Sequence, residues 1–186
     1  MNNVITSKEA ILSAARQIAA EKGLPALNMR TVAAACGIAV GSVYNYFPSK
    51  TDLVIATIED VWKSIFHKQA KGDTVRSFID EVQWLSDRIR TGTEEYPSFF
   101  TVHAMGVAQA DRKKGRIVMN EYFVHMKAGL LQSLQADSNV RSGVFTSDFT
   151  QEDFVSFVFS NLITSFATNA KSCSTLFQVV RRILYS

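Results

Sequence analysis

The sequence of 186 residues predicts an all-α protein of about nine helices. Three prolines and nine glycines are few for this length, and they do not cluster at the intervals of about 8 to 12 residues that separate the strands of an all-β protein. Apolar residues recur instead with the spacing of helix faces, and a hydrophobic content of 47% is enough for a buried core without disulfides. We expect a small N-terminal domain of three helices, residues 1–50, and a larger C-terminal helical domain, residues 51–186.

The first helix is predicted between a capping box at its start and a glycine at its end. Thr6 and Glu9 have the spacing of a capping box, in which the hydroxyl and the carboxylate bond to backbone amides of the first turn. The apolar residues that follow keep helical spacing until Gly23 and Pro25, which end the helix.

A second and a third helix follow within a short distance. Asn28 is a favoured N-cap residue, and Gly37 supplies the left-handed conformation that ends a helix of barely two turns. Only residues 38–40 lie between Gly37 and the next helical segment, residues 41–47. This spacing is typical of a helix-turn-helix, whose second helix enters the major groove of DNA. An ordinary corner between two packed helices has the same spacing, so spacing alone leaves both interpretations open.

The third helix has three distinct surfaces when its residues are placed at about 100° per residue. The inward surface is apolar and consists of Val40, Val43 and Phe47. The opposite surface is slim and polar, suited to a close approach to base edges, and consists of Gly41, Ser42 and Asn45. Tyr44 and Tyr46 flank it, where their hydroxyls would reach phosphates on either wall of a groove. Alternatively, one ring packs in the core and the other is a surface aromatic.

A basic residue at the start of the fourth helix adds an independent indication. Ser49 is expected to cap this helix, and Lys50 then opposes the helix dipole at a cost of about 0.3–1 kcal/mol. A phosphate in front of the helix would reverse that cost, although a solvated lysine is the alternative. Residues 1–50 contain five basic and two acidic residues, so the whole net charge of +3 lies there. Such a basic end is typical of proteins with a polyanionic partner.

The stretch ILSAARQIAAEKG, followed by NMRTVAAACGIAVGSVYNYFPSKTDL, resembles the DNA-binding domain of the tetracycline-repressor (TetR) family of bacterial regulators. The resemblance runs from about Lys8 to Leu53 and implies a helix-turn-helix DNA-binding domain in residues 1–50, followed by an effector-binding and dimerisation domain. It implies phosphate contacts by Asn28, Tyr44, Tyr46 and Lys50. It implies base reading by Arg30, Val40, Gly41, Ser42 and Asn45.

One residue departs from the family pattern. Ala39 stands where the family usually has Ser or Thr, and its methyl group cannot cap the recognition helix or bond to a phosphate. Ser42 is the partial substitute that the sequence offers.

Six further helices are expected in the C-terminal domain, at residues 49–71, 73–92, 97–107, 111–134, 151–170 and 174–185. Gly92 is taken as the end of the second of these. The helix of residues 151–170 is apolar nearly all round, so it must be buried on several sides, one of them against another subunit. The last helix would complete a four-helix homodimer interface with its symmetry mate, as the resemblance implies.

Aromatic, sulfur-bearing and amide side chains gather on the central helices, as in apolar cavities with a few polar groups. The candidate effector-binding residues are Trp62, Phe66, Trp84, Phe100, His103, Tyr122, Met126 and Asn161. Each of them taken singly is also an ordinary core residue. As a group they indicate a small apolar or aromatic effector rather than a highly charged one.

Several other classes of protein are disfavoured. His67, His103 and His125 lie on separate predicted helices or too far apart for a pair, and no phosphate loop, nucleophile elbow or His-Glu-x-x-His motif occurs, so we expect no enzyme. Cys36 and Cys173 lack partners at metal-ligand spacing, so no metal or cofactor is expected. No apolar run reaches the roughly 18 residues of a membrane span, and the N-terminus lacks a signal-peptide core, which favours the cytoplasm.

The predicted function is therefore a homodimeric transcription regulator, most simply a repressor. It would bind a palindromic double-stranded operator and release it when a small molecule occupies the C-terminal domain. The sequence leaves activation in place of repression open. The alternative is a helical ligand-binding or partner-binding protein without operator binding.

Overall fold

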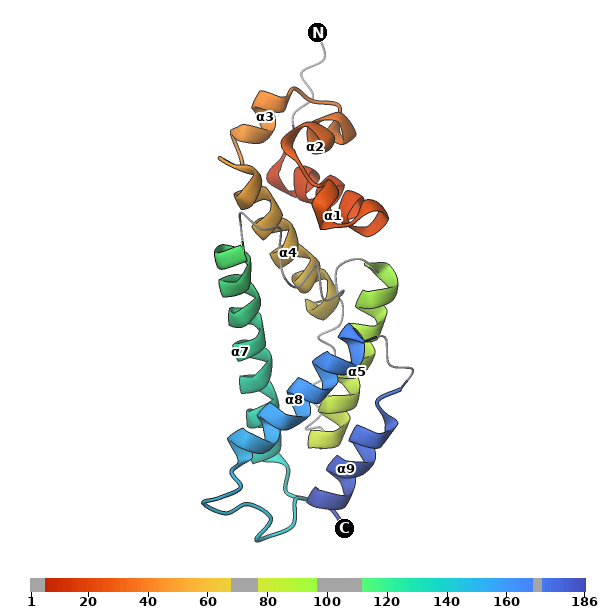
Figure 1. Ribbon diagram of the computed structural model, residues 1–186, viewed down its shortest axis with the longest axis vertical. Coiled ribbons are helices and arrows are strands. Elements are labelled where there is room, and N and C mark those ends of the chain that lie inside the picture. Colours follow the sequence, from red (N-terminus) through yellow and green to blue (C-terminus); the bar gives the residue numbers. More distant parts are fainter. Residues whose placement is uncertain (1–5, 68–76, 97–111, 169–171) are drawn as a thin grey trace. The chain divides into compact units, whose positions relative to one another are not determined.

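The computed structural model describes residues 6–67, 77–96, 112–168 and 172–186. Within these ranges the regular structure is helical, apart from an isolated bridge between Thr146 and Phe149, which confirms the all-α class (Figure 1). The chain divides into two compact units, one of residues 1–70 and 92–118 and the other of residues 71–91 and 119–186. The first unit includes all of the fourth helix, and the functional boundary at residue 50 stays a prediction.

The first unit is built from four α-helices and one short 3₁₀ helix. They are α1 (Lys8–Lys22), η1 (Leu24–Ala26), α2 (Met29–Cys36), α3 (Val40–Tyr44) and α4 (Lys50–His67). Helix α1 packs against α2 and α4, and α2 packs against α3 (Figure 1). Their shared core is apolar and fully buried, and includes Ile11, Ala15, Leu27, Val32, Val43, Leu53 and Trp62.

Helix α1 begins one residue later than the capping box predicts. Ser7 is the N-cap, and its hydroxyl accepts a hydrogen bond from the Ala10 amide at 3.1 Å. The predicted box of Thr6 and Glu9 is therefore wrong, because the third helical position belongs to Ala10. The Thr6 carbonyl instead accepts a hydrogen bond from the Tyr46 hydroxyl at 2.7 Å.

Both ends of α2 are formed as predicted. The Asn28 side chain accepts hydrogen bonds from the amides of Arg30 and Thr31, both at 3.0 Å, and the Thr31 hydroxyl accepts one from the Asn28 amide at 3.1 Å. Gly37 adopts the left-handed conformation, with φ 66° and ψ 31°, and ends the helix. These caps fix the direction in which the chain leaves α2, and so fix the position of α3.

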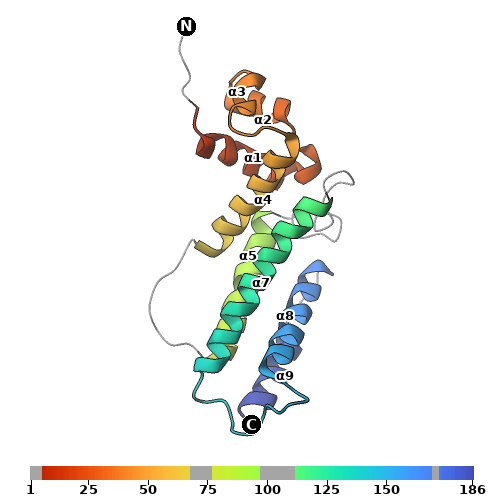
Figure 2. The ribbon, with the colours of Figure 1, turned by 90° about the vertical axis from the view of Figure 1, so that its left-hand side faces the viewer.

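The second unit contains most of α5 (Phe78–Glu95) and α7 (Arg112–Ala136), with α8 (Gln151–Ala167) and α9 (Ser174–Leu184). Helix α8 packs against α9 (Figure 2). Aromatic rings join α8 to the other two helices, through Phe78 and Phe154 at 5.9 Å between centroids and Phe123 and Phe159 at 5.3 Å. Within the described ranges, none of the helices is both long and apolar enough to cross a lipid bilayer.

Three predicted helix ends are wrong, and one predicted helix falls outside the described residues. Helix α3 ends at Tyr44 and not at residue 47, because Pro48 follows and disfavours a helical conformation in the residue before it. Helix α5 continues through Gly92 to Glu95, because a glycine with ordinary helical φ costs only about 1 kcal/mol relative to alanine and does not oblige the helix to stop. Helix α8 ends at Ala167, where the Thr168 amide bonds to the Thr164 carbonyl. The helix expected at residues 97–107 and the cap expected at position 73 lie outside the described residues.

A buried carboxylate ties three helices of the second unit together. Asp137, which follows α7, accepts hydrogen bonds from the Phe78 amide at 2.8 Å and from the Tyr185 hydroxyl at 2.6 Å. It also accepts one from the Asn139 amide at 2.9 Å, and the Tyr185 oxygen accepts one from the Ile79 amide at 3.3 Å. The carboxylate thus caps α5 and holds the residue that follows α9. We refer to Asp137 and Tyr185 together as the Asp137–Tyr185 clamp.

Candidate nucleic-acid interface

Helix α3 has the inward and outward faces that its sequence predicts. Val43 and Phe47 are buried beneath it, and Val40 is half-buried. Gly41 and Asn45 are exposed on the other side, and Ser42 is half-buried. The polar edge predicted to read bases is therefore accessible along the whole of this short helix.

The start of α3 lacks a side-chain cap, as expected from alanine at that position. Ala39 adopts extended dihedrals and no side chain bonds to the free amides, while its carbonyl accepts the Ser42 amide at 2.9 Å. Ser42 does not substitute as a cap, because its hydroxyl forms no hydrogen bond to α3 within the described residues. Whether it substitutes as a phosphate contact stays a prediction. The turn before α3 is held instead by backbone bonds, among them the Ile38 amide to the Ala33 carbonyl at 3.0 Å.

Gly41 is a residue that the fold itself does not require. A Cβ built at this position has no atom within 4 Å, and the φ angle of Gly41 is not positive. Glycine nevertheless costs a helix about 0.8–1.0 kcal/mol relative to alanine. A missing side chain on this open surface would allow another molecule to approach the backbone closely.

Four exposed side chains around Gly41 offer uncommitted donors. Tyr44 is 50% exposed, and Asn45, Arg30 and Lys50 are also exposed. None of these side chains forms a hydrogen bond or ion pair within the described residues. They come from α2, α3 and the first position of α4. Donors of this kind are what phosphate oxygens and base edges accept.

The two tyrosines differ in a way that the sequence does not reveal. Tyr46 is 40% exposed, but its single hydroxyl proton is committed to the Thr6 carbonyl at 2.7 Å. A phosphate contact by Tyr46 therefore requires that this bond be exchanged. The Tyr44 hydroxyl has no such partner, so the two predicted phosphate contacts are not equivalent.

Most hydrogen-bonding groups of the Asn28 side chain already have partners within the fold. Its oxygen accepts two backbone amides of α2, and its nitrogen donates to the Ala26 carbonyl at 3.4 Å. One N–H of the side-chain amide remains for a phosphate at the N-terminus of α2.

Some basic side chains of the first unit have partners within the fold, and others are exposed to solvent. Arg16 forms an ion pair with Asp60 of α4, with Nε and Oδ2 separated by 2.9 Å. The Lys8 ammonium lies 5.8 Å from the centre of the buried Phe47 ring. Arg30 and Lys50 are exposed and have neither kind of partner in the described ranges. Lys22 at the end of α1 and Lys63 on α4 are exposed in the same way, so the free cations of this unit include the two beside α3 but are not confined to them.

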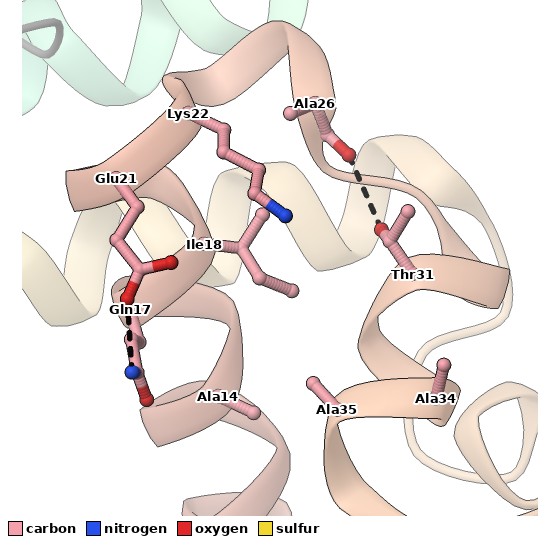
Figure 3. Close-up of a pocket in the computed structure, with 9 residues that line it drawn as sticks. All are labelled: Ala14, Gln17, Ile18, Glu21, Lys22, Ala26, Thr31, Ala34 and Ala35. Carbon is pink, nitrogen blue, oxygen red and sulfur yellow. Dashed lines mark hydrogen bonds between the residues drawn. The ribbon is translucent and has the colours of Figure 1, made fainter.

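A hollow of about 520 Å³ lies elsewhere on this unit, between α1 and α2. Figure 3 shows alanine side chains of the two helices facing each other across it, with Lys22 extending over them. Its polar walls are already satisfied, since Gln17 donates to Glu21 at 3.0 Å and Thr31 donates to Ala26 at 3.2 Å. It contains none of the residues predicted to bind DNA or effector.

The predicted effector-binding residues are spread over both units. Trp62 is fully buried and stacks on Phe66, with centroids 5.5 Å apart, in the first unit. In the second unit, Tyr122 and Met126 are half-buried on α7. Asn161 is exposed on α8 and donates to the Phe157 carbonyl at 2.8 Å, which fits a subunit interface better than a cavity. Phe100 and His103 lie outside the described residues.

Trp84 has a neighbour that the sequence reasoning did not single out. The guanidinium carbon of Arg88 lies 6.0 Å from the centre of the Trp84 ring, and both residues are half-buried on α5. The spacing of four residues between an aromatic residue and an arginine was the available signal, because it places both on one helix face.

Comparison with known proteins gives the same assignment for the N-terminal helices. The family model described as bacterial regulatory proteins, tetR family, matches residues 11–57, the segment that contains α2, α3 and the contact residues of the candidate interface. Residues 11–57 of the chain thus match a TetR-family regulator. The match confirms the resemblance seen in the sequence, while the roles of single residues stay predictions.

Two relatives from Rhodococcus jostii are named as HTH-type transcriptional repressors. KstR is 26% identical over 113 residues, a match that spans 56% of this chain and only about half, 53%, of KstR. KstR2 is 27% identical over 147 residues, which cover 76% of this chain and 69% of KstR2. A solved TetR regulator from Streptomyces coelicolor shares the fold, with a TM-score of 0.63 and 19% identity over 94% of this chain and 77% of that one.

Proposed function

We propose that this TetR-family protein is a DNA-binding transcription regulator that represses its target genes. It binds a palindromic operator as a homodimer, in the cytoplasm of a bacterial cell, and leaves the operator when a small effector occupies the C-terminal domain. The observation that carries the proposal is the surface of α3, where a glycine that the fold does not need lies among uncommitted donors.

The assignment of contacts follows from which groups are free. Tyr44 and Lys50 are proposed to bind phosphates, because their donors are exposed at the edge of α3 and at the start of α4. Asn28 would add the remaining N–H of its amide. Arg30 and Asn45 are proposed to read bases, since both side chains form planar patterns of hydrogen bonds. Val40 and Ser42 border the same edge, and Gly41 allows the backbone to approach.

Repression is favoured by the relatives, because KstR and KstR2 are both named as transcriptional repressors. An operator bound by a two-fold symmetric dimer is a palindrome, with half-sites about 34–36 Å apart. Binding of RNA polymerase to such a site would then be blocked sterically.

The homodimer is proposed to form through α8 and α9. Phe157 is 48% exposed on α8, on the same side as the exposed Ser160, Asn161 and Thr164. Small and polar residues around a large apolar side chain let a second helix approach closely. On α9 the half-buried apolar residues are Leu176, Phe177, Val179 and Ile183. A self-complementary apolar surface of this kind suits a two-fold interface.

The effector is proposed to act by binding one arrangement of the dimer better than another. A ligand with equal affinity for the operator-bound and free arrangements would change nothing, so its contacts must differ between them. The half-buried residues of α5 and α7, among them Trp84, Tyr122 and Met126, are the proposed contacts within the second unit.

Operator binding is tested by fluorescence anisotropy with labelled DNA from either side of the protein's own gene. We expect saturable binding whose affinity falls steeply between about 50 and 200 mM salt, because phosphate contacts release counterions. Lys50→Ala should weaken binding to all sequences alike and reduce the salt slope by about 0.9. Lys63→Ala, an exposed lysine on α4, is the control and should leave the slope unchanged.

The second candidate function, a ligand-binding protein without operator binding, is favoured by one observation. Helix α3 starts without a side-chain cap, which leaves its N-terminus less firmly held than a serine or threonine would. The same titration separates the two functions: if no fragment binds at low salt, the operator-binding proposal fails.

A further inference from the structure

Two of the three guanidinium nitrogens of Arg88, a half-buried residue on α5, are buried without a hydrogen-bond partner. Its Nε and Nη2 atoms are inaccessible to solvent, yet neither forms a hydrogen bond within the described structure. A buried cation is costly unless a carboxylate or another acceptor compensates it, so buried arginines are normally paired. The Nε atom of Arg16 in the first unit is also buried without a geometrically acceptable hydrogen bond, but its charge is compensated, because the Asp60 carboxylate lies 2.9 Å away. No such carboxylate lies within ion-pair distance of Arg88 in the described residues.

No carboxylate on α5 is placed to pair with Arg88. Its neighbours one turn away are Trp84, Leu85, Thr91 and Gly92, and none of them has a charge. The adjacent Asp87 forms an ion pair with Arg90 at 3.0 Å, on a part of the helix where both side chains are more than half exposed. The compensating anion is therefore not supplied by this helix.

The two unpartnered atoms lie on one edge of the guanidinium plane. The N–H groups of Nε and Nη2 are parallel, and together they form the fork that binds both oxygens of a carboxylate. The Trp84 ring, 6.0 Å from the guanidinium carbon, restricts the orientation of this plane. Arg88 and Trp84 thus provide an oriented fork beside an apolar aromatic surface.

From this geometry we propose that the effector is a hydrophobic acid, whose carboxylate binds to the Nε and Nη2 edge of Arg88 and whose apolar part lies against Trp84. The inference rests on the proposed function, because it assigns a chemical class to the effector of the C-terminal domain. It also refines the composition-based expectation: the effector is apolar over most of its surface but has one anionic end.

The experiment compares acids with neutral molecules of the same shape, using the full-length protein. Thermal unfolding is measured with 2-naphthoate against 2-naphthamide, and with decanoate against decanol. We expect the acids to raise the unfolding temperature and to bind about tenfold or more tightly than their neutral counterparts, because only the acids accept charge-assisted hydrogen bonds. Equal binding of acid and neutral compound, or no binding of either acid up to its solubility limit, would overturn the proposal.

Arg88→Met and Arg90→Met form a matched pair of variants on the same helix. Methionine keeps an unbranched side chain of similar length, so the packing around Trp84 is largely retained. Arg88→Met should lose about tenfold or more in affinity for the acids. Arg90→Met should retain it, since Arg90 is 64% exposed and pairs with Asp87. Unchanged acid affinity in Arg88→Met would contradict the assignment.

A measurement without ligand tests the unpaired charge directly. If the guanidinium has no anion in the free protein, Arg88→Met should leave the unfolding temperature unchanged or raise it, because two buried N–H groups without acceptors are removed. A decrease larger than that of Arg90→Met would mean that Arg88 is paired within the chain, and the proposal would fail.

Operator binding separates this inference from the proposed function. Both variants should bind operator DNA as the wild type does without ligand, and saturating naphthoate should release DNA from the wild type and not from Arg88→Met. If acids bind in an Arg88-dependent way to a protein that binds no DNA, the inference stands and the regulator proposal fails. If DNA binding is normal but acids do not bind, only the inference fails.

Discussion

Gly41 lies in α3 although nothing in the fold excludes a larger residue there. The space around a Cβ at this position is empty, and the backbone is in a conformation that any residue adopts. The chain therefore gives up helix stability at the point where the backbone would come closest to the floor of a groove. The fold does not require this loss, and we propose that close approach to DNA does.

Gly41→Ala should separate the two effects. The unfolding free energy should rise by up to about 1 kcal/mol, because alanine is the better helix former. Operator affinity should fall, since the added methyl group fills the space between the helix and the base edges. Equilibrium urea unfolding and anisotropy titration measure the two quantities.

A second open glycine provides the control for this substitution. Gly129 lies on α7 in the other unit, and a Cβ there also has no atom within 4 Å. Gly129→Ala should stabilise the protein similarly and leave operator affinity unchanged. A Gly41→Ala variant that binds DNA as tightly as the wild type would show that α3 does not approach DNA at this residue.

At the scale of elements, α3 depends on its neighbours. A helix of five residues has no stability of its own, and it is held by the burial of Val43 and Phe47 and by the bond from Tyr46 to the segment before α1. That bond joins residues 40 positions apart, so the end of α3 and the start of α1 support each other. The exposed Tyr44 hydroxyl has no such structural role.

Tyr46→Phe should therefore lower stability, whereas Tyr44→Phe should lower operator affinity. Tyr46→Phe removes a hydrogen bond of the fold, and the unfolding free energy should fall by about 0.5–1.5 kcal/mol with little change in operator affinity at temperatures where the variant is folded. Tyr44→Phe should leave stability unchanged and weaken operator binding. Loss of affinity in Tyr46→Phe without loss of stability would show that its hydroxyl leaves Thr6 for a phosphate in the complex.

Local sequence was enough to predict most elements, and the misses have physical causes. Asn28, Gly37 and Ser49 form the caps that were predicted, because a cap depends on residues three or four positions away. The cap of α1 at Ser7 was missed, since Thr6 and Ser7 are adjacent hydroxyl residues and either can serve as an N-cap. The end of α5 was missed because packing tolerates a glycine inside a helix.

The outline of the candidate interface could be predicted from the sequence, but not which of its hydrogen-bond donors already have partners in the fold. The outward and inward faces of α3 follow from its periodicity alone. Which donors remain free does not, because Tyr46 is occupied by a residue from the start of the chain. The missing partner of Arg88 is a property of the packed structure, and only the neighbouring Trp84 was visible in the sequence.

At the scale of the whole molecule, hydrogen bonds between residues far apart in the sequence join helices. Hydrophobic periodicity predicts each helix but not which helices are joined. The Asp137–Tyr185 clamp joins segments up to 106 positions apart, from the start of α5 to the end of α9. Burial tends to raise the pKa of Asp137, but the hydrogen bonds from Tyr185, Phe78 and Asn139 outweigh it and hold that pKa below its ordinary value. Burial and the hydrogen bond to Asp137 raise the pKa of Tyr185 to about 12.

These shifts predict how the contribution of the clamp depends on pH. The Asp137 pKa is lowered by folding, so its contribution is present above the ordinary value of about 3.9 and is lost as the pH falls through the lower, folded value. The Tyr185 pKa is raised, so its contribution is complete below the ordinary value of about 10 and is lost as the pH rises toward about 12. Between these limits both groups are in the state that the fold favours.

Tyr185→Phe should therefore cost most at neutral pH. The variant loses a hydrogen bond to a carboxylate, and its unfolding free energy should be lower by about 1.5–3 kcal/mol. The difference from the wild type should shrink below about pH 4, where Asp137 becomes protonated, and above about pH 10, where the wild type loses its own advantage. Urea unfolding across this range measures it, with Tyr44→Phe as the control, because the Tyr44 side chain is exposed and forms no hydrogen bond within the described residues. A difference that stays constant with pH would mean that the hydroxyl contributes through packing and not through its bond to the ionised Asp137.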